Sequence, residues 1–291
     1  MAYFDVPEIE YTRYSNRQLA AVPLAVLAVA LIVLSGSFLV YGTPVPLGMD
    51  FAGGTELTVQ TTTPEGEIGS AFEEPPESVT GTGSSNEYII QFSSTDSQAL
   101  NEQAESNLEQ NGDSAIVQSV SSTSASFGQE SQRTAMIGLV VAFVGMSAIA
   151  FLLFRTFVPS IAIVISAFSD LMIPLAFMRL AGIPLSLGTV AGLLMLIGYS
   201  VDSDILLNNH VLRRSGDFYE STARAMRTGV TMTVTSMAAM LVMAVSAYIF
   251  GIGLLASIGI ILFVGLAADL MNTYMLNLSL LRWYKFEGVR S

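Results

Sequence analysis

Four aspartates stand in stretches of sequence that are otherwise apolar, and their chemistry calls for an explanation. Asp202 and Asp204 follow an apolar run that begins near Ile183. Asp170 and Asp269 each stand inside another such run. A carboxylate in hydrocarbon costs at least about 2.5 kcal/mol, so it is normally retained where it handles ions or binds a partner. The pattern predicts that the chain moves charge across a membrane.

The depth of each aspartate follows from the helical rise of about 1.5 Å per residue. Counted inward from the ends of their apolar runs, Asp170, Asp202 and Asp269 lie about 16 to 20 Å deep, near the membrane midplane. Asp204 lies about 13 Å from the basic end of its span and is expected to reach a wetter cytoplasmic vestibule. We expect these four residues to be candidates for coupling ion movement to work.

A purely structural role is the alternative for each acid. Asp269 has Asn272 and Thr273 three and four residues later, so hydrogen bonds between helices could account for it. For Asp269 the sequence leaves both interpretations open. The isolated Asp170, and at least one member of the 202/204 pair, are better explained by function.

The fifth apolar run begins with Arg227 and a segment rich in hydroxyl groups, Thr228 to Ser236. Hydroxyl groups can hydrogen-bond neighbouring helices or line a wet path for an ion. From residue chemistry alone, Arg227 is best explained as an ordinary basic anchor at the interface. The alternative is a cation that comes into contact with Asp204.

The composition predicts a membrane protein with one small domain outside the bilayer. The chain of 291 residues is 52% hydrophobic and yet has a formal net charge of -12. Six runs are long enough to cross about 30 Å of hydrocarbon as helices, near residues 19–41, 134–154, 158–180, 183–207, 228–250 and 252–281. The first run is too long for a typical signal-peptide core and is expected to be an uncleaved anchor. Between the first two runs, residues 42–133 carry fourteen Asp or Glu and no basic residue before Arg133.

The polar segment 42–133 shows the pattern of a small α+β domain. Residues 56–62 alternate with period two and residues 88–92 are rich in β-formers, so both are predicted strands. Residues 96–110 are a predicted helix and residues 115–120 another strand. Residues 63–86, rich in Pro, Gly, Glu and Ser, are predicted to form a loop. Strand, helix and strand in this order indicate a split βαβ, ferredoxin-like arrangement.

Ten of the twelve basic residues fall on flanks that would share one side of the membrane. Because cytoplasmic flanks carry the basic excess, residues 1–18 and the tail 282–291 are expected in the cytoplasm, with 42–133 outside and 134–281 as a five-helix membrane region. The chain has eleven Arg and one Lys, beside an acidic external domain. This surface is typical of a protein that stays soluble in concentrated salt, and a docking surface for a cationic partner is the alternative.

The sequence lacks the usual residues of several other chemistries. It has no cysteine, and therefore no disulfide or thiolate metal site. No nucleotide-binding loop of the Gly-x4-Gly-Lys type and no metal motif is found. We expect neither enzymatic activity nor a cofactor, and an ion gradient is the only evident energy source.

Residues 47–55 resemble the Gly-x-Asp-Phe-x-Gly-Gly-Thr signature of the SecD/SecF family of membrane-integrated protein-export factors, part of the resistance-nodulation-division superfamily. The matching positions are Gly48, Asp50, Phe51, Gly53, Gly54 and Thr55. Residues 126–130, 168–170, 198–214 and 227–228 resemble further family segments, so the resemblance covers essentially the whole chain. The external domain of roughly 90 residues is similar in size to that of SecF members, because SecD members carry a much larger one.

The resemblance implies a six-helix half-transporter in the cell membrane that pairs with SecD and with the SecY channel. It also implies that the external domain engages unfolded preprotein and that proton or sodium flow drives the work. Under this resemblance Arg227 is expected to contact Asp204 and to move when the ion binds. The acid at 202 stands where SecD members have theirs, so which carboxylate carries the ion is left open. A passive assembly factor, and half of an exporter of small molecules or lipids, are the alternative functions.

Overall fold

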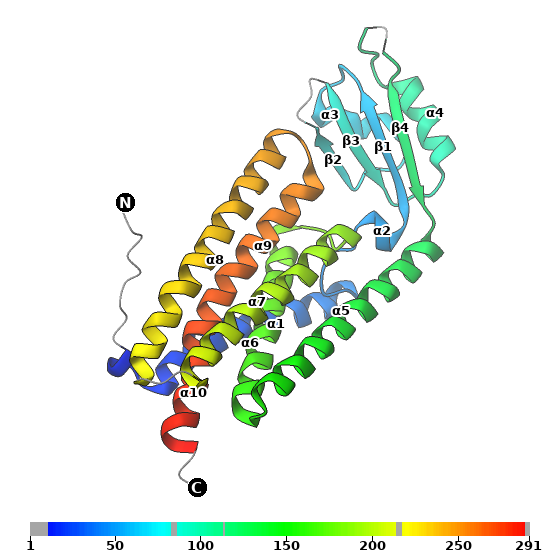
Figure 1. The fold of residues 1–291 in the computed structure, drawn as a ribbon. Helices are drawn as coiled ribbons and strands as arrows, with labels where there is room; N and C mark the ends of the chain where they lie inside the picture. Colours follow the sequence, from blue (N-terminus) through cyan, green and yellow to red (C-terminus); the bar gives the residue numbers. More distant parts are fainter. Residues whose placement is uncertain (1–10, 83–85, 113, 214–216, 289–291) are drawn as a thin grey trace, which may run out of the picture.

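A computed structural model describes residues 11–82, 86–112, 114–213 and 217–288. These residues form a bundle of long helices with a small α+β domain at one end (Figure 1). The described chain ends lie together at the opposite end of the bundle. There the Arg282 guanidinium donates to the carbonyls of Tyr11 at 2.9 Å and Tyr14 at 2.7 Å.

Six helical stretches of the described chain are long and apolar enough to cross a membrane, which confirms the predicted number. The first five are α1 (Asn16–Tyr41), α5 (Ala125–Phe154), α6 (Phe157–Ala181), α7 (Leu187–Arg213) and α8 (Phe218–Ile249). The sixth stretch is composite. It begins with α9 (Gly253–Met271) and continues through the π-helical segment η3 (Asn272–Asn277) into α10 (Leu278–Trp283) and a second π-helical segment, η4 (Tyr284–Gly288). A short 3-10 helix, η1 (Tyr11–Arg13), precedes α1.

Two spans begin well before their apolar windows. Helix α5 starts at Ala125, nine residues before the predicted start at 134, and α8 starts at Phe218, ten residues before 228. Capping side chains explain both starts: Ser124 accepts from Phe127 N–H, and Asp217 accepts from Tyr219 N–H. A cap satisfies N–H groups that the first helical turn leaves open, so the helix can begin in polar sequence.

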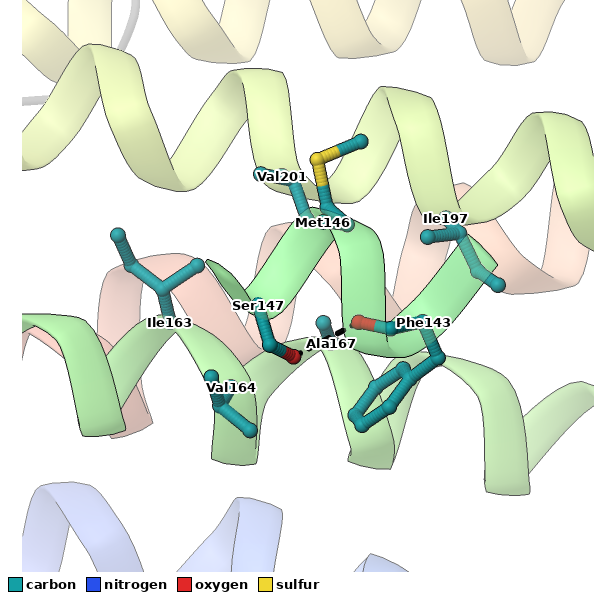
Figure 2. A pocket seen from close by; sticks show the side chains of 8 residues that line it. All are labelled: Phe143, Met146, Ser147, Ile163, Val164, Ala167, Ile197 and Val201. Atoms are coloured by element: carbon teal, nitrogen blue, oxygen red, sulfur yellow. Dashed lines mark hydrogen bonds between the residues drawn. The ribbon is translucent and has the colours of Figure 1, made fainter. Parts of the chain in front are cut away.

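Helices α6 and α7 are the most enclosed spans, whereas α5 and α8 expose most of their surface. Helix α9 packs against α6, α7 and α8, and α1 packs against α6. On the other side α5 lies across α6 and α7, where Phe143 and Met146 meet Ala167 and Val201 in a narrow apolar crevice (Figure 2). The one hydroxyl there, that of Ser147, donates to its own helix at the Phe143 carbonyl, 2.8 Å away.

The α+β domain is a four-stranded antiparallel sheet with the order β2-β3-β1-β4. The strands are β1 (Gly54–Gln60), β2 (Ser78–Gly81), β3 (Glu87–Phe92) and β4 (Val117–Thr123). Segments α3 (Glu65–Ile68) and η2 (Gly69–Ala71) connect β1 to β2, and α4 (Ser97–Asn107) connects β3 to β4. This strand order and connectivity confirm the predicted ferredoxin-like arrangement.

The prediction that residues 63–86 form only a loop is wrong, because they contain α3, η2 and β2. These elements are short, and the edge strand β2 has no buried residue. Their sequences therefore lack the periodic apolar pattern that predicts a longer helix or strand. Strand β1 does give that signal: Leu57 and Val59 face Ile90, Leu100 and other apolar side chains in a closed core.

Candidate functional site

Three of the four intramembrane aspartates lie in one buried cluster between three spans. Asp170 comes from α6, Asp204 from α7 and Asp269 from α9, and their exposed fractions are 1%, 0% and 1%. Buried charge is costly unless it is paired or hydrogen-bonded. The hydrogen bonds around the three carboxylates therefore decide what the cluster can do.

The Asp170 carboxylate accepts one hydrogen bond on each oxygen. Ser200 Oγ of α7 donates to Oδ2 at 2.5 Å, and Asn272 Nδ2 of η3 donates to Oδ1 at 2.5 Å. Pro174 stands four residues later in α6. Because proline has no N–H, the backbone carbonyl of Asp170 receives no α-helical hydrogen bond. The Asp170 side chain thus links three spans. Its backbone carbonyl oxygen is a further acceptor that has no α-helical N–H donor.

Hydroxyl groups join the other two carboxylates. Ser203 Oγ donates to Asp269 Oδ1 at 2.6 Å. Thr273 Oγ1 lies 2.9 Å from Asp204 Oδ1 and 3.2 Å from Asp269 Oδ1. Asn277 Nδ2 donates to Asp204 Oδ1 at 2.8 Å. A hydroxyl group carries one proton, so Thr273 can donate to only one of its two carboxylates at a time.

Several oxygen atoms in and beside the cluster are buried without a hydrogen-bond partner. They are Ser166 Oγ, Ser169 Oγ, Asp204 Oδ2, Asn208 Oδ1, Asn272 Oδ1 and Asn277 Oδ1. Buried polar atoms are normally satisfied by protein, water or an ion. A set made of carboxylate, hydroxyl and amide oxygens suits water, a proton or a hard cation such as sodium. The residues present therefore fit a small cation or protons.

Among the described side chains, no Lys, Arg or His forms an ion pair with these carboxylates, and the ion pair of Arg224 with Glu220 lies elsewhere. Three negative charges held close together in a low-dielectric region would repel one another strongly. Three bare carboxylates are therefore unfavourable here unless protons or a cation offset their charge.

Helix geometry explains why these side chains meet. Asp269, Thr273 and Asn277 are spaced by four residues and share one face. The last two lie in η3, where the wider π-helical turn replaces the α-helical one. Such segments are frequent at functional sites. In α7, Ser200 and Asp204 are likewise four residues apart and face the cluster.

Asp202 lies apart from the cluster. It is exposed on α7, on the same face as Met195 and Tyr199, whose exposed fractions are 48% and 43%. Two residues apart on a helix point about 200° away from each other, so Asp202 and Asp204 face opposite directions. The acid that joins Asp170 and Asp269 is therefore Asp204. The Asp204 side chain is fully buried, so the expected wetter cytoplasmic vestibule around Asp204 is not found.

The expected contact between Arg227 and Asp204 is also not found. Arg227 is exposed on α8, while the Asp204 carboxylate accepts from Thr273 and Asn277. The neighbouring hydroxyl groups of α8 are satisfied within their own helix. For example, Thr231 donates to the Arg227 carbonyl at 2.7 Å. Thr228, Thr231 and Thr235 of this segment are exposed on the outer surface of the bundle, whereas Thr233 is buried.

Sequence reasoning did not single out Ser200, Ser203 and Asn277 as members of the cluster. A signal for each was present in the spacing. Ser200 and Ser203 precede Asp204 within one helical turn, and Asn277 lies eight residues after Asp269, which is about two turns.

The segment 48–55 forms the joint between the bundle and the α+β domain. The carboxylate of Asp50, in the short helix α2 (Met49–Ala52), accepts from the backbone N–H of Leu187, the first residue of α7, at 3.0 Å. Gly48 N–H donates to the Leu185 carbonyl at 2.8 Å, and Leu185 N–H donates to the Pro46 carbonyl at 2.7 Å. Helix α2 is thereby fastened to the connection between α6 and α7.

Close packing explains the small residues of this joint. A Cβ atom on Gly54, whose φ is +131°, would lie 2.2 Å from the Phe92 carbonyl oxygen. Gly53, with φ +82°, packs against the start of α5. The Phe51 side chain of α2 is 2% exposed, and Thr55, the second residue of β1, is fully buried. Side chains at either glycine would separate α2 from the elements it connects.

A second contact joins the bundle to the α+β domain. Gly251, with φ +69°, lies in the turn between α8 and α9 against the carbonyl of Thr82 in the domain, where no Cβ atom would fit. The domain therefore contacts the bundle at α2 and at the turn between α8 and α9.

Comparison with known families agrees with this architecture. The family model described as protein export membrane protein SecD/SecF, C-terminal, matches residues 103–287, and the SecD/SecF GG motif matches residues 38–65. The chain is 62% identical over 289 residues to a protein-export membrane protein SecF of Haloferax volcanii, with 99% of each chain covered. It is 39% identical over 279 residues to a SecF of Methanolacinia petrolearia, covering 96% of this chain and 97% of that one.

A solved structure shows the same fold. The crystal structure of SecDF, a translocon-associated membrane protein from Thermus thermophilus, superposes with a TM-score of 0.72 at 19% identity. The match covers 96% of this chain and 39% of that longer chain. Together with the family models and the relatives, the fold shows that the chain belongs to the SecD/SecF family of protein-export membrane proteins, on its SecF branch.

Proposed function

We propose that this chain assists preprotein translocation together with SecD and the SecY channel, and that proton or sodium flow through the acidic cluster drives the work. The observation that supports this most is the cluster of Asp170, Asp204 and Asp269, which is fully buried and has no basic partner among the described residues. One charge crossing about 100 mV supplies about 2.3 kcal/mol. That energy suffices to rearrange a few hydrogen bonds.

The joint at α2 offers a route from the cluster to the α+β domain. Helix α7 carries Asp204 in its second half, and the backbone N–H of its first residue, Leu187, donates to Asp50. Ser203 and Thr273 both donate to Asp269 Oδ1. When a cation or proton binds the carboxylates, these two hydroxyl groups can turn to other acceptors. A shift of α7 that follows would pull on α2 and so tilt the domain. On this proposal the domain lies outside the cell membrane and engages emerging unfolded preprotein, while both termini lie in the cytoplasm.

The outer face of α7 and α8 is proposed to bind SecD. It presents Asp202 in mid-span and, on α8, Arg227 and a row of threonines, all exposed. Intramembrane ionisable groups almost always face protein or water rather than lipid. In transporters of repeated halves, the second half supplies that cover. The face is therefore better suited to a second six-helix protein than to lipid.

The ion-coupling proposal is tested by replacing each clustered acid with its neutral isostere. Asp170→Asn, Asp204→Asn and Asp269→Asn keep the shape and remove the titratable charge. Each variant, purified with SecD and reconstituted into vesicles, is assayed for ion uptake under an imposed proton or sodium gradient, and in cells for preprotein export. We expect ion uptake and export to fall together while SecD still copurifies.

Asp217→Asn is the matched control, because Asp217 caps α8 outside the cluster and Asn caps helices equally well. It should leave uptake and export unchanged. Wild-type ion uptake and export in all three cluster variants would contradict ion coupling and leave the role of a passive assembly factor. Loss of SecD copurification in the cluster variants would instead show that the acids serve assembly.

The SecD-facing surface is tested by cross-linking, which the absence of cysteine makes simple. Met195→Cys and Tyr199→Cys place single thiols on the exposed face of α7. We expect disulfide cross-links from both to matching cysteines in SecD. Ile32→Cys on α1, 71% exposed in this chain, is the control and should give none. Cross-links from α1 but not from α7 would place SecD on the other side of the bundle.

A further inference from the structure

A cavity of about 520 Å³ opens between α1 and α5 in the half of the bundle next to the α+β domain. Its lining is apolar except for Ser35. The walls and floor include Leu34 and Phe38 of α1, Met136 and Leu139 of α5, Leu175 of α6 and Val190 of α7. Phe38 and Met136 are 58% and 46% exposed, whereas Val190 is 6% exposed. The cavity thus runs from the outer surface of the bundle inward to α7.

Two arginines lie one helical turn from residues that line this cavity. Arg179 lies one turn beyond Leu175 on α6, and its guanidinium carbon is 4.0 Å from the ring centroid of Tyr41, the last residue of α1. Arg133 lies one turn before Met136 on α5. The other ten basic residues belong to the flanks at the opposite end of the spans. By sequence position, Arg133 and Arg179 are thus the basic residues at the ends of the spans next to the α+β domain.

The chemistry of the cavity and of the nearby arginines selects its occupant. The apolar face of a partner helix would fill the lining but would leave the arginines without an anionic partner. A soluble anion would gain nothing from apolar walls. A flexible hydrocarbon chain with a negative head satisfies both parts, since its methylenes fill the apolar space and its head meets the arginines.

We propose that this cavity binds an anionic phospholipid, with one acyl chain between α1 and α5 and the phosphate at Arg179, assisted by Arg133. The cation–π contact with Tyr41 holds the Arg179 guanidinium at the end of α1 while leaving its N–H groups for the phosphate. The cavity wall also contains Val45 and Leu185, which flank the backbone hydrogen bond from Leu185 to Pro46. A bound lipid would therefore support the connection that fastens α2 to the bundle.

The test uses tryptophan fluorescence in the complete chain purified with SecD. Trp283, the only tryptophan, is replaced by Phe, and Met136→Trp places a reporter at the cavity mouth. The protein is reconstituted into vesicles of phosphatidylcholine mixed with brominated phosphatidylglycerol or brominated phosphatidylcholine, which quench the reporter on contact. We expect the anionic lipid to be preferred at this site by roughly five-fold, the effect of one basic residue near an anionic surface.

Matched variants separate the parts of the proposal. Arg179→Gln should abolish the preference, whereas Arg17→Gln, which removes an exposed arginine at the far end of α1, should leave it intact. A reporter at Val144→Trp, exposed on the same helix α5, outside the cavity and eleven residues from both Arg133 and Arg155, should show no preference. Inorganic phosphate should not compete, because the site requires the acyl chain.

Three results would overturn the proposal. Equal quenching by both brominated lipids at Met136→Trp would show no headgroup selection. An absence of quenching by either lipid would show that SecD covers the cavity. Competition by inorganic phosphate with unchanged acyl-chain contact would show a simple anion site at the arginines. None of these readouts depends on ion flow, so the proposal stands or falls independently of the coupling mechanism.

Discussion

The hydroxyl oxygen of Thr273 lies 2.9 Å from the Asp204 carboxylate and 3.2 Å from the Asp269 carboxylate. With a single proton to donate, this hydroxyl group can serve only one of the two carboxylates at a time, while Asn277 remains a donor to Asp204 and Ser203 to Asp269. The arrangement therefore has at least two states of similar geometry, and under the proposed ion coupling an entering ion would decide between them.

Replacing Thr273 by valine should strengthen ion binding while preserving packing. The Thr273 hydroxyl donates a hydrogen bond that stabilises the ion-free carboxylate. A hydrogen bond to a charged group contributes about 1.5 to 3 kcal/mol, so the ion concentration for half-maximal uptake should fall roughly ten-fold or more. Ion uptake into vesicles, titrated at fixed membrane potential, measures this shift. Thr222→Val is the control, because Thr222 is equally buried and its hydroxyl donates to its own helix at Phe218. An unshifted titration for Thr273→Val would remove this hydroxyl group from the ion path.

Asp50 should contribute to stability through the start of α7. Asp50→Ala removes the acceptor for Leu187 N–H, and losing such a cap costs about 0.5 to 2 kcal/mol. Asp50→Asn keeps an oxygen acceptor and should fall between the wild type and Asp50→Ala. Thermal unfolding of the purified protein gives the order. Glu105→Ala, which removes an exposed acid of α4, should leave the melting temperature unchanged; an equal loss there would mean that net charge, not the cap, is responsible.

Much of the fold follows from sequence because its signals are long and repetitive. Six apolar runs predict six spans, and the alternating pattern at 56–62 predicts the central strand of the sheet. Short elements gave no such signal, so β2 and α3 were missed. The early starts of α5 and α8 depend on single capping side chains, Ser124 and Asp217, which outweigh the polar sequence that follows.

The candidate site was predicted less completely, because depth along a span does not reveal direction around it. Asp202 and Asp204 have nearly the same depth, yet they point to opposite sides of α7. Packing against α6 and α9 decides which one is buried. The expected Arg227 contact was wrong for the same reason, since α8 turns that residue outward.

Two glycines of α5 should respond in opposite ways to alanine. A Cβ atom on Gly128 would lie 2.7 Å from the Phe51 carbonyl oxygen, whereas one on Gly138 meets nothing within 4 Å. Gly138→Ala should therefore be neutral or stabilise by up to about 1 kcal/mol, the difference in helix propensity. Gly128→Ala should destabilise the chain and loosen α2, which limited proteolysis of the α+β domain detects. Equal behaviour of the two variants would show that α2 does not pack closely on α5 in the membrane.

The contribution of Arg227 to export should require the guanidinium geometry if Arg227 binds SecD. It should require only the positive charge if Arg227 is an interfacial anchor. Lysine keeps the charge but lacks the planar fork that pairs with a carboxylate through two hydrogen bonds. We therefore expect Arg227→Lys to reduce preprotein export measurably and Arg227→Ala to reduce it further. Both variants should also weaken the Met195→Cys cross-link to SecD.

Arg224 provides the internal comparison for this last prediction, because it lies one turn earlier on the same face of α8. Its ion pair with Glu220, 3.8 Å long and exposed, contributes at most about 1 kcal/mol. Arg224→Lys should therefore export preprotein at the wild-type rate. Export by Arg227→Lys that matches wild type across a range of external pH and sodium would make Arg227 an ordinary anchor, since an anchor requires only a positive charge near the cytoplasmic interface.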